Sequence, residues 1–587
     1  MKVAKKLKYR KDIDGLRAIA VLSVLLFHLG YLPNGYLGVD IFFAISGYLI
    51  TKIVYDKAIE NRFSIVNFYL KRTRRIIPLI FFTSLVALII GIIVMLPEDL
   101  KNLSETIIAT NFFANNMCML VTSGDYWDIA NEYKPMMHTW SLGVEEQFYI
   151  VFPVLFMICN GKRSRFILPI LIALTILSLL FFFFATSDTS KFYLIQYRFF
   201  ELSLGGLGAI LFKDKIINTK YAFLLTLSIL ALLVLNIPIN ADLKLLLILL
   251  ATICLLVVGG DRNKISLFLL QNKVMLHIGK ISFSLYMWHQ IVLAFTRYFI
   301  LEKIGIIDSI VLFIIILLLS WFSYYLIEQP FRDKKRVRTK TLLLLLAGFF
   351  VIIITSSAFI YINGGVVKDV PELELYTKDN TYNIASRRQN IHVAYNSRIN
   401  DLNKGFSKDS TLKVFVIGNS RARDFSNILL ESDIHNLEIS YVQDISTCQD
   451  MQERLDQSNL IFFTNFNVAE YKRIKSKFRL DKEKIYNVIL HNKFGVSNGI
   501  FYNDKDDNYF SQCTTIDQKT LDETNAIKKY WKNRSIDILA PVIDKDNTVP
   551  VFTPEGKFIS PDCIHLTQAG AKYYAEKVRI KNILKIN

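Results

Sequence analysis

The sequence lacks the features of a secreted or soluble protein. Its first apolar stretch has no small-residue cleavage site and is interrupted by Asp14 and Arg17, so we expect a retained membrane span and no cleavable signal peptide. Runs of about 20 residues, such as 77–96 and 342–362, contain no charged side chain. A helix of that length crosses a hydrocarbon core of ~30 Å. The missing charges therefore predict a membrane protein.

Cysteine is scarce, with six in 587 residues. Three of them, Cys448, Cys513 and Cys563, fall in the C-terminal part, where an oxidising compartment would permit one disulfide bridge. The sequence does not choose the pair.

Hydropathy predicts an all-α membrane bundle of about ten core spans and one linking span. We place the spans at residues 12–32, 36–56, 77–97, 138–159, 166–186, 193–212, 221–238, 243–259, 276–301, 308–328 and 341–362.

Basic residues are rare in one set of loops. With a cytoplasmic N-terminus, the inside segments hold 27 Lys and Arg, whereas the short outside loops before the last span hold four. This bias obeys the positive-inside rule. Topology thus explains the net charge of +18, and we predict a lipid bilayer as partner and no nucleic acid.

Composition changes sharply after residue 363, where long apolar runs stop and Asn, Asp, Lys and Ser become common. We therefore predict a transmembrane domain over 1–335, a linking helix over 336–363, a connector over 364–410 and a second domain over 411–587. An odd number of spans places the last two parts outside the membrane. The last part is long enough for a core of its own.

The first span carries Arg17 and His28, which are 11 residues apart. That spacing corresponds to about 1,100° of helix rotation, so both lie within about 20° of one face and roughly 16 Å apart along the axis. Arg17 should lie near the cytoplasmic side and His28 near the outer side. A snorkelling arginine and an interfacial histidine are the simpler interpretation, but the pair favours function.

Further polar residues lie inside predicted spans, where charges are costly and mark function by default. Taken singly, each is explained by contacts between helices; together they are too many for that explanation. Arg198 and Glu201, at i, i+3, predict an ion pair. The other candidates are Asp40 and Ser46 in the second span, His138, Glu145 and Glu146 in the fourth, and His289 in the ninth.

Two arginines with i, i+3 spacing, Arg72 and Arg75, lie between the second and third spans on the cytoplasmic side. Arginine forks suit bidentate contacts with phosphate. Ordinary positive-inside topology is the alternative explanation.

These segments, in this order, resemble the acyltransferase-3 family of membrane acyltransferases over about residues 10–332. The matching stretches are DGLRAIAVLSVLLFHLG, GYLGVDIFFAISGYLIT, FYLKRTRRIIP, HTWSLGVEEQFYI, RFFELSLGGLGA, ISFSLYMWH and SYYLIEQPFR. The resemblance implies transfer of acyl groups, commonly acetyl from cytoplasmic acetyl-CoA, onto carbohydrates outside the membrane, with no metal. It makes His28 the essential histidine, with Arg17 as its partner.

The same resemblance assigns the phosphates of the donor to Arg72 and Arg75. Glu146, Glu145, His138 and Ser46 fall in matching motifs with less defined roles, and we group Glu146 with the catalytic candidates.

The C-terminal part begins with a predicted strand at 412–417, followed by Gly418-Asn419-Ser420 and a helical stretch. A serine on such a turn is exposed beside free N–H groups. With Asp562 and His565 near the end of the chain, the pattern resembles the SGNH hydrolase family. The resemblance implies an α/β/α fold with a mostly parallel sheet, and a triad in which His565 activates Ser420 and Asp562 orients His565.

This sequence departs from the SGNH pattern in two places. Asn419 stands where the commonest motif has Asp, and the middle blocks that supply the oxyanion hole are unclear. Asn465, Asn467 and Asn492 are candidates, and the sequence does not choose among them. A decayed domain that only binds glycan is the alternative.

Together these patterns predict a bacterial inner-membrane O-acetyltransferase that modifies a polysaccharide in the periplasm or elsewhere outside the cytoplasm. O-antigen, lipopolysaccharide, capsule and peptidoglycan all remain open as acceptors. Two rival hypotheses are a transporter or flippase of a lipid-linked glycan, which needs neither the arginine pair nor the serine domain, and a membrane-anchored glycan esterase, which would tolerate loss of His28.

Overall fold

The computed structural model describes residues 9–122, 131–159, 161–213, 221–259, 264–301, 303–378, 391–407, 412–432, 434–445, 448–490 and 494–581. The chain divides into two compact units. Unit 1 consists of residues 1–93 and 102–359, and unit 2 consists of residues 94–101 and 360–587.

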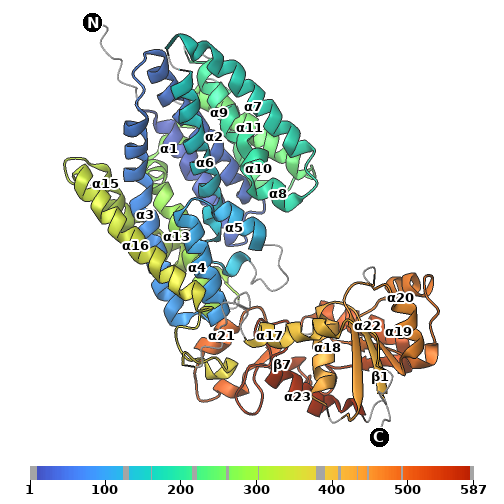
Figure 1. The fold of residues 1–587 in the computed structure, drawn as a ribbon. Helices are drawn as coiled ribbons and strands as arrows, with labels where there is room; N and C mark the ends of the chain where they lie inside the picture. Colours follow the sequence, from blue (N-terminus) through green and yellow to red (C-terminus); the bar gives the residue numbers. More distant parts are fainter. Residues whose placement is uncertain are drawn as a thin grey trace. The chain divides into compact units, whose positions relative to one another are not determined.

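Each of the eleven predicted spans corresponds to a helix (Figure 1). These helices are α1 Lys11–His28, α2 Gly38–Ile59, α3 Ile65–Val94, α6 Trp140–Ile158, α7 Ile167–Phe183, α9 Ile195–Leu211, α10 Ala222–Val234, α11 Ala241–Val258, α13 Lys273–Phe299, α14 Ile306–Ser323 and α16 Thr339–Ile362. Shorter helices join them: α4 Pro97–Asn111, α5 Asn115–Thr122, α8 Asp188–Tyr193, α12 Lys264–Gln271 and α15 Gln329–Arg332.

Seven of the described helical segments are long and apolar enough to cross a membrane. They are Gly35–Ile59, Ile65–Val94, Met137–Ile158, Arg163–Phe183, Ala241–Val258, Ile306–Arg332 and Thr339–Ile362. Among the remaining predicted spans, α10 has only 13 residues, and α1 carries Asp12, Asp14 and Arg17. The chain is thus a multi-pass membrane protein.

One boundary prediction was wrong. The basic stretch around Arg72 and Arg75 is not a loop, because it forms the first turns of the 30-residue helix α3, which continues through Pro78. No residue between 65 and 77 breaks a helix, so the helix begins twelve residues earlier than hydropathy alone indicates.

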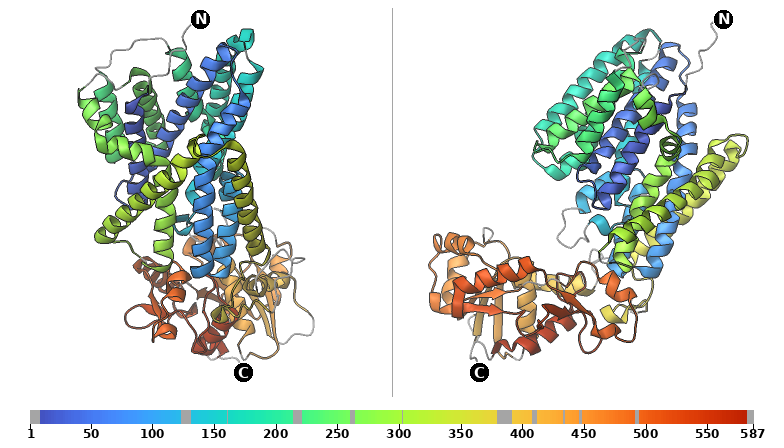
Figure 2. Two further views of the ribbon diagram at one scale, coloured as in Figure 1. Left: turned by 90° about the vertical axis from the view of Figure 1, so that its left-hand side faces the viewer. Right: turned by 180° about the vertical axis from the view of Figure 1, so that it is seen from behind.

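Small residues allow the central helices of unit 1 to approach closely. A Cβ atom placed on Gly47 of α2 would lie 1.8 Å from the Leu202 carbonyl oxygen of α9, and one on Gly279 of α13 would lie 1.9 Å from the Asp14 carbonyl oxygen of α1. Glycine at such positions is typical of packed membrane helices. In Figure 2, right, the dark-blue α1 and α2 lie between the green helices and the lighter-blue α3. The helices that carry Arg17, His28, Asp40 and Ser46 therefore lie between other helices of the bundle.

Unit 2 contains a parallel five-stranded sheet with the order β2-β1-β3-β4-β6. Its strands are β1 Leu412–Ile417, β2 Leu437–Val442, β3 Leu460–Thr464, β4 Ile485–Ile489 and β6 Ser535–Asp537. Two short strands, β5 Cys513–Thr515 and β7 Thr548–Pro550, form an antiparallel pair. The helices are α17 Ile391–Ser397, α18 Ser420–Leu430, α19 Met451–Gln457, α20 Val468–Lys475, α21 Asn498–Asn503, α22 Gln518–Trp531 and α23 Gln568–Val578.

Alternate residues of β1 face two different hydrophobic clusters. Val414 and Val416 pack with residues of α18 and α23, whereas Phe415 and Ile417 pack with residues of α19, α20 and α22. Side chains alternate between the two faces of a strand, so helices cover both faces of the sheet. This arrangement confirms the predicted α/β/α fold of the C-terminal part.

A third cluster of unit 2 includes a residue from the beginning of the α3–α4 connection. Leu96 packs with Val370, Leu373 and Phe558, and the Asn503 amide donates a hydrogen bond of 2.9 Å to the Val94 carbonyl. No sequence pattern indicates that residues 94–101 belong to the C-terminal unit.

Within the described ranges, none of the six cysteines is joined to another by a disulfide bridge. Cys513 is exposed, whereas Cys563 is buried and its thiol lies 3.1 Å from Asn498 Oδ1. The disulfide bridge that the sequence would permit is therefore not formed.

Candidate active site

Unit 1 contains a cavity of about 560 Å³ between α1, α2, α3, α6 and α13. Among the described residues that line it, Glu145 is the one acidic side chain, and Ser46, Ser141 and Tyr286 also belong to the lining. Eight basic side chains line it: Arg17, Lys57, Lys71, Arg72, Arg74, Arg75, Arg332 and Lys334. The cavity is therefore strongly basic and suits a ligand with several negative charges.

The three arginines of α3 have different surroundings. The Arg72 guanidinium lies 4.2 Å from the centre of the Tyr149 ring. Arg74 is buried and donates hydrogen bonds to the Phe331 carbonyl (2.9 Å) and to Thr339 Oγ1 (3.0 Å). Arg74 therefore joins α3 to the segment before α16, while Arg72 and Arg75 remain available to a ligand in the cavity.

The two adjacent glutamates of α6 point in different directions. Glu145 lines the cavity, where it accepts hydrogen bonds from Ser46 Oγ (2.8 Å) and the Tyr149 hydroxyl (3.4 Å). Glu146 is buried, is not part of the lining, and its Oε1 atom has no hydrogen-bond partner among the described residues. Neighbouring positions on a helix are about 100° apart, which explains the difference. The geometry thus favours Glu145 over Glu146 as the carboxylate that meets a ligand.

Three histidines from distant spans meet in unit 1. The ring centres of His28 and His138 each lie 5.1 Å from that of His289. A carbonyl can only accept, so Nδ1–H of His28 donates to Val24 (2.9 Å) and Nδ1–H of His289 donates to Tyr286 (2.6 Å). In the neutral rings, Nε2 is therefore the basic nitrogen.

Tyr286 connects the cavity to these histidines. Its hydroxyl donates to the His138 carbonyl (2.7 Å) and lies 2.7 Å from Ser141 Oγ, and its ring centre lies 5.1 Å from that of His138. Tyr286 and Ser141 both line the cavity. Sequence reasoning assigned neither residue to the site, although Tyr286 lies three residues before His289.

Asp40 belongs to a buried group of ion pairs. Arg198 forms ion pairs with Asp40 (3.1 Å) and with Glu201 (2.6 Å), and all three side chains are buried. The predicted Arg198–Glu201 pair is confirmed. Asp40 is not part of the cavity lining, so the triad joins α2 to α9 without facing the cavity.

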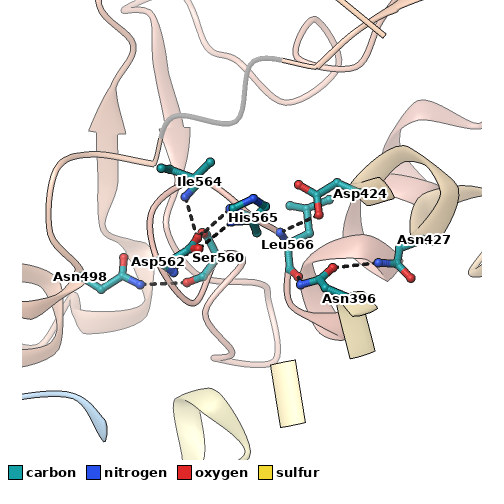
Figure 3. Close-up of polar contacts among 9 residues, drawn as sticks. All are labelled: Asn396, Asp424, Asn427, Asn498, Ser560, Asp562, Ile564, His565 and Leu566. Carbon is teal, nitrogen blue, oxygen red and sulfur yellow. Dashed lines mark hydrogen bonds and ion pairs between the residues drawn. The ribbon is translucent and has the colours of Figure 1, made fainter. Parts of the chain in front are cut away.

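In unit 2, Asp562 and His565 form a close pair (Figure 3). Nδ1–H of His565 donates to Asp562 Oδ2 at 2.6 Å, and Asp562 Oδ1 accepts the backbone N–H groups of Ile564 and His565. Burial raises the pKa of Asp562, but the hydrogen bonds from His565 outweigh burial and hold it below its usual value. Burial lowers the pKa of His565 despite the opposing effect of Asp562.

Buried amides hold the loop that carries His565. The Asn498 amide donates to the Ser560 carbonyl (2.9 Å), and the Asn396 amide donates to the Leu566 carbonyl (3.1 Å), as Figure 3 shows. Asn427 in turn donates to Asn396 Oδ1 (2.9 Å). Sequence reasoning missed these residues because no short motif marks them.

Ser420 begins α18 directly after β1, as predicted. Gly418 has φ +147°, which favours glycine, and Asn419 Oδ1 caps the helix by accepting the Arg421 N–H at 3.1 Å. The Ser420 hydroxyl is buried and has no hydrogen-bond partner among the described residues. A Ser420–His565 hydrogen bond is thus absent from the described part of the chain, and the buried hydroxyl differs from the exposed position that the turn predicts.

The comparisons with known proteins agree with the geometry of unit 1. Residues 10–325 match the model of the family Acyl_transf_3, described as an acyltransferase domain. The chain belongs to the acyltransferase-3 family. The matched residues include His28, Arg72, Arg75, Glu145 and His289.

Relatives of this acyltransferase-3 chain include the O-acetyltransferase OatA of Staphylococcus aureus strains NCTC 8325 and MRSA252. Each is 30% identical over 352 residues, which is 56% of this chain and 58% of the relative. A further protein of strain MSSA476 is 31% identical over 360 residues, with the same coverage of both chains. The aligned part thus spans less than two thirds of these curated relatives. No solved structure matches the chain.

The asparagines proposed for the oxyanion hole differ in their environment. Asn465, which has φ +56°, donates from its amide to the Leu490 carbonyl (2.9 Å) and accepts the Leu490 N–H (2.9 Å). Asn467 caps α20. Asn492 lies outside the described residues. Asn465 therefore has a structural role, joining the ends of β3 and β4.

Replacing Asn465 by alanine is expected to destabilise unit 2 by about 2–3 kcal/mol, because two hydrogen bonds and the preference of asparagine for positive φ are lost. The measurement is the urea midpoint of proteolysis in the full-length protein, with cleavage products assigned to unit 2. Asn508→Ala, at an exposed position, is the control. Equal midpoints for the two variants would contradict the structural role.

Proposed function

We propose that this acyltransferase-3 protein transfers acetyl from cytoplasmic acetyl-CoA to a hydroxyl of a polysaccharide outside the membrane, by way of Ser420. The observation that carries the proposal is the basic cavity that reaches Tyr286, beside the three histidines. The loop charge bias supports a cytoplasmic N-terminus and an extracytoplasmic unit 2. The proposed functional parts are residues 1–335, 336–363, 364–410 and 411–587.

The part of the cavity lined by Arg72 and Arg75 would hold the phosphates of CoA. Arg72 and Arg75 offer planar forks for bidentate contacts, and the surrounding lysines add positive charge. His28, through Nε2, would act on the acetyl donor as general base or as transient acyl carrier. Its ring is not part of the cavity lining, whereas Arg17 lines the cavity and would stabilise negative charge there.

The acceptor step would take place in unit 2. Ser420 Oγ attacks the carbonyl carbon of the delivered acetyl group, and His565 takes the hydroxyl proton. The bond between the acetyl group and its carrier (the CoA thiol or the His28 imidazole) then breaks, the carrier leaves with that proton, and an acetyl-serine remains. A sugar hydroxyl then attacks this ester, loses its proton to His565, and releases Ser420. Asp562 holds the imidazole with Nδ1 protonated, which keeps Nε2 free for proton transfer. The names of the Staphylococcus aureus relatives support O-acetyl transfer, and O-antigen, lipopolysaccharide, capsule and peptidoglycan remain the candidate acceptors.

Labelled acetyl-CoA tests the proposal directly. Sealed inverted membrane vesicles that contain the protein and envelope glycan receive acetyl-CoA labelled in the acetyl group. The expected result is ester-linked, alkali-labile label on glycan inside the vesicles. Label that stays in solution would support a transporter, and release of existing acetyl groups without uptake of label would support an anchored esterase; either result would overturn the proposal.

The double variant Arg72→Gln/Arg75→Gln is expected to raise the KM for acetyl-CoA by at least about tenfold, since hydrogen bonds to charged groups contribute roughly 1.5–3 kcal/mol each. Initial rates of label transfer at varied acetyl-CoA concentration provide the measurement. Arg62→Gln is the matched control, because Arg62 is exposed, pairs with Glu60 and does not line the cavity. An unchanged KM in the double variant would contradict the proposed contact of Arg72 and Arg75 with the phosphates of CoA.

Ser420-dependent hydrolysis of p-nitrophenyl acetate is expected to be constant at neutral pH and to fall only below about pH 6.5. The base form of His565 must be neutral, and burial holds its pKa below the ordinary value, so protonation begins at lower pH. The measurement is the kcat/KM profile after subtraction of the Ser420→Ala rate. An acidic limb centred above pH 6.5 would contradict the assignment of His565.

A further inference from the structure

Unit 2 has its own cavity, of about 810 Å³, at the carboxyl edge of the parallel sheet. Strand β1 lies between β2 and β3 in the sheet. The connection that follows β1 leads to β2 on one side of it, and the next connection leads from β2 to β3 on the opposite side of β1. In open α/β sheets, ligands bind in the crevice at this point of reversal. The residues that follow β1 and β3 line the cavity, including Gly418 and Asn419 next to Ser420. We call this cavity the β1–β3 crevice.

One buried hydroxyl faces the β1–β3 crevice without a partner. Thr464 is 3% exposed and lines the crevice, and its Oγ1 atom has no hydrogen-bond partner among the described residues. A buried unsatisfied hydroxyl costs about 1–3 kcal/mol, so a polar ligand here would gain from satisfying it. Phe466 and Phe478 add aromatic surface to the same lining, which suits the apolar face of a sugar ring.

The charges of the β1–β3 crevice are mainly positive. Arg421, Arg473 and Lys477 line it, and within the described ranges neither Arg473 nor Lys477 has a carboxylate partner. The lining also contains two carboxylates, Asp444 and Glu470, and Glu470 accepts the Asn467 N–H at 3.0 Å as part of a helix cap. A group that carries negative charge can therefore meet two unneutralised cations.

We propose that the β1–β3 crevice binds the glycan acceptor and selects sugars that carry a negative charge, as carboxylate or phosphate. Bound there, such a glycan lies beside Asn419, the chain neighbour of Ser420; the Ser420 side chain is not itself part of the lining. The inference rests on the proposed function and adds the class of acceptor to it. Arg473 and Lys477 are the residues that determine specificity.

Direct binding to full-length Ser420→Ala protein in detergent tests the inference without catalysis. The probes are penta-galacturonic acid, a phosphorylated maltopentaose and neutral maltopentaose, each titrated by calorimetry. At least one charged probe is expected to bind about tenfold or more tightly than the neutral one. Adding Arg473→Gln and Lys477→Gln is expected to weaken that binding about tenfold or more.

The matched control is the pair Lys472→Gln and Lys475→Gln. Both lysines are exposed on α20, neither lines the β1–β3 crevice, and the pair removes the same total charge. The control is expected to change binding by less than about twofold. Equal affinity for charged and neutral probes, or equal effects of the two double variants, would overturn the inference.

These binding results do not depend on whether the proposed acetyl transfer from acetyl-CoA through Ser420 takes place. If Ser420→Ala protein binds acidic glycan in the β1–β3 crevice but the wild type transfers no label from acetyl-CoA, the proposed function fails and the crevice remains a glycan site. If label is transferred normally and charge has no effect on binding, only the acceptor class is wrong.

Discussion

Replacing His28 by alanine is expected to reduce acetyl transfer to the glycan by about a thousandfold or more. A positioned general base contributes roughly 10²–10⁴ to the rate, and loss of a covalent carrier would remove the route altogether. Nε2 of His28 is the basic nitrogen of the neutral ring, and the ring centre of His289 lies 5.1 Å away, so that His289 does not hold a base in the same position. The measurement is O-acetyl content of the envelope glycan, with the membrane level of each variant determined in parallel.

His277→Ala is the control for this prediction. His277 belongs to α13, as does His289, but its ring is 6.5 Å from Tyr325 and it takes no part in the group of three histidines. Both variants should keep Ser420-dependent hydrolysis of p-nitrophenyl acetate, since that reaction needs unit 2 alone. Normal glycan acetylation in His28→Ala cells would contradict the proposal that unit 1 takes acetyl from the donor. The esterase and transporter hypotheses would then remain.

Replacing Ser420 by alanine is expected to abolish both activities, glycan acetylation and hydrolysis of p-nitrophenyl acetate, each by about a thousandfold or more. The hydroxyl lies at the start of α18, where the helix N-terminus stabilises negative charge that develops on the ester. The contrast with His28→Ala separates the two steps, because only Ser420→Ala loses the hydrolysis of the small ester.

Ser432→Ala, at the other end of α18, is the control, since its hydroxyl donates only to the Leu429 carbonyl. Full acetylation in Ser420→Ala cells would show that the acetyl group reaches the sugar without an acetyl-serine. In that case unit 2 would bind the acceptor, and the histidines of unit 1 would carry the chemistry alone.

The membrane helices were predictable because a single apolar segment satisfies all its backbone hydrogen bonds in a bilayer only as a helix. Each of the eleven predicted spans is a helix in the structure. The strand–turn–helix at Ser420 was predictable for a similar reason, since the turn residues Gly418 and Asn419 fit their positions locally. Helix α3 began earlier than expected because hydropathy marks the membrane interior and says little about where a helix extends beyond it.

The convergence of side chains could not be predicted in the same way. His28, His138 and His289 meet because of how α1, α13 and the turn just before α6 pack, which depends on close contacts such as that at Gly279. Sequence placed Glu145 and Glu146 on different faces but could not say which face meets the cavity. Asn465 is a candidate for the oxyanion hole by residue type, and the structure adds that it joins the ends of β3 and β4 through its contacts with Leu490 and lines the β1–β3 crevice.

Residues 94–101 belong to unit 2, and this affects both the expression of unit 2 as a fragment and its exchange between related proteins. A fragment that starts at residue 360 would leave the pocket around Val370 and Phe558 without Leu96, and would leave Asn503 without the Val94 carbonyl. Grafting the C-terminal unit of one relative onto the helices of another should therefore succeed only when the eight-residue corner between α3 and α4 is exchanged with it. For the same reason, substitutions at Leu96 and at its partners should be correlated through evolution, although more than 260 residues separate them in the chain.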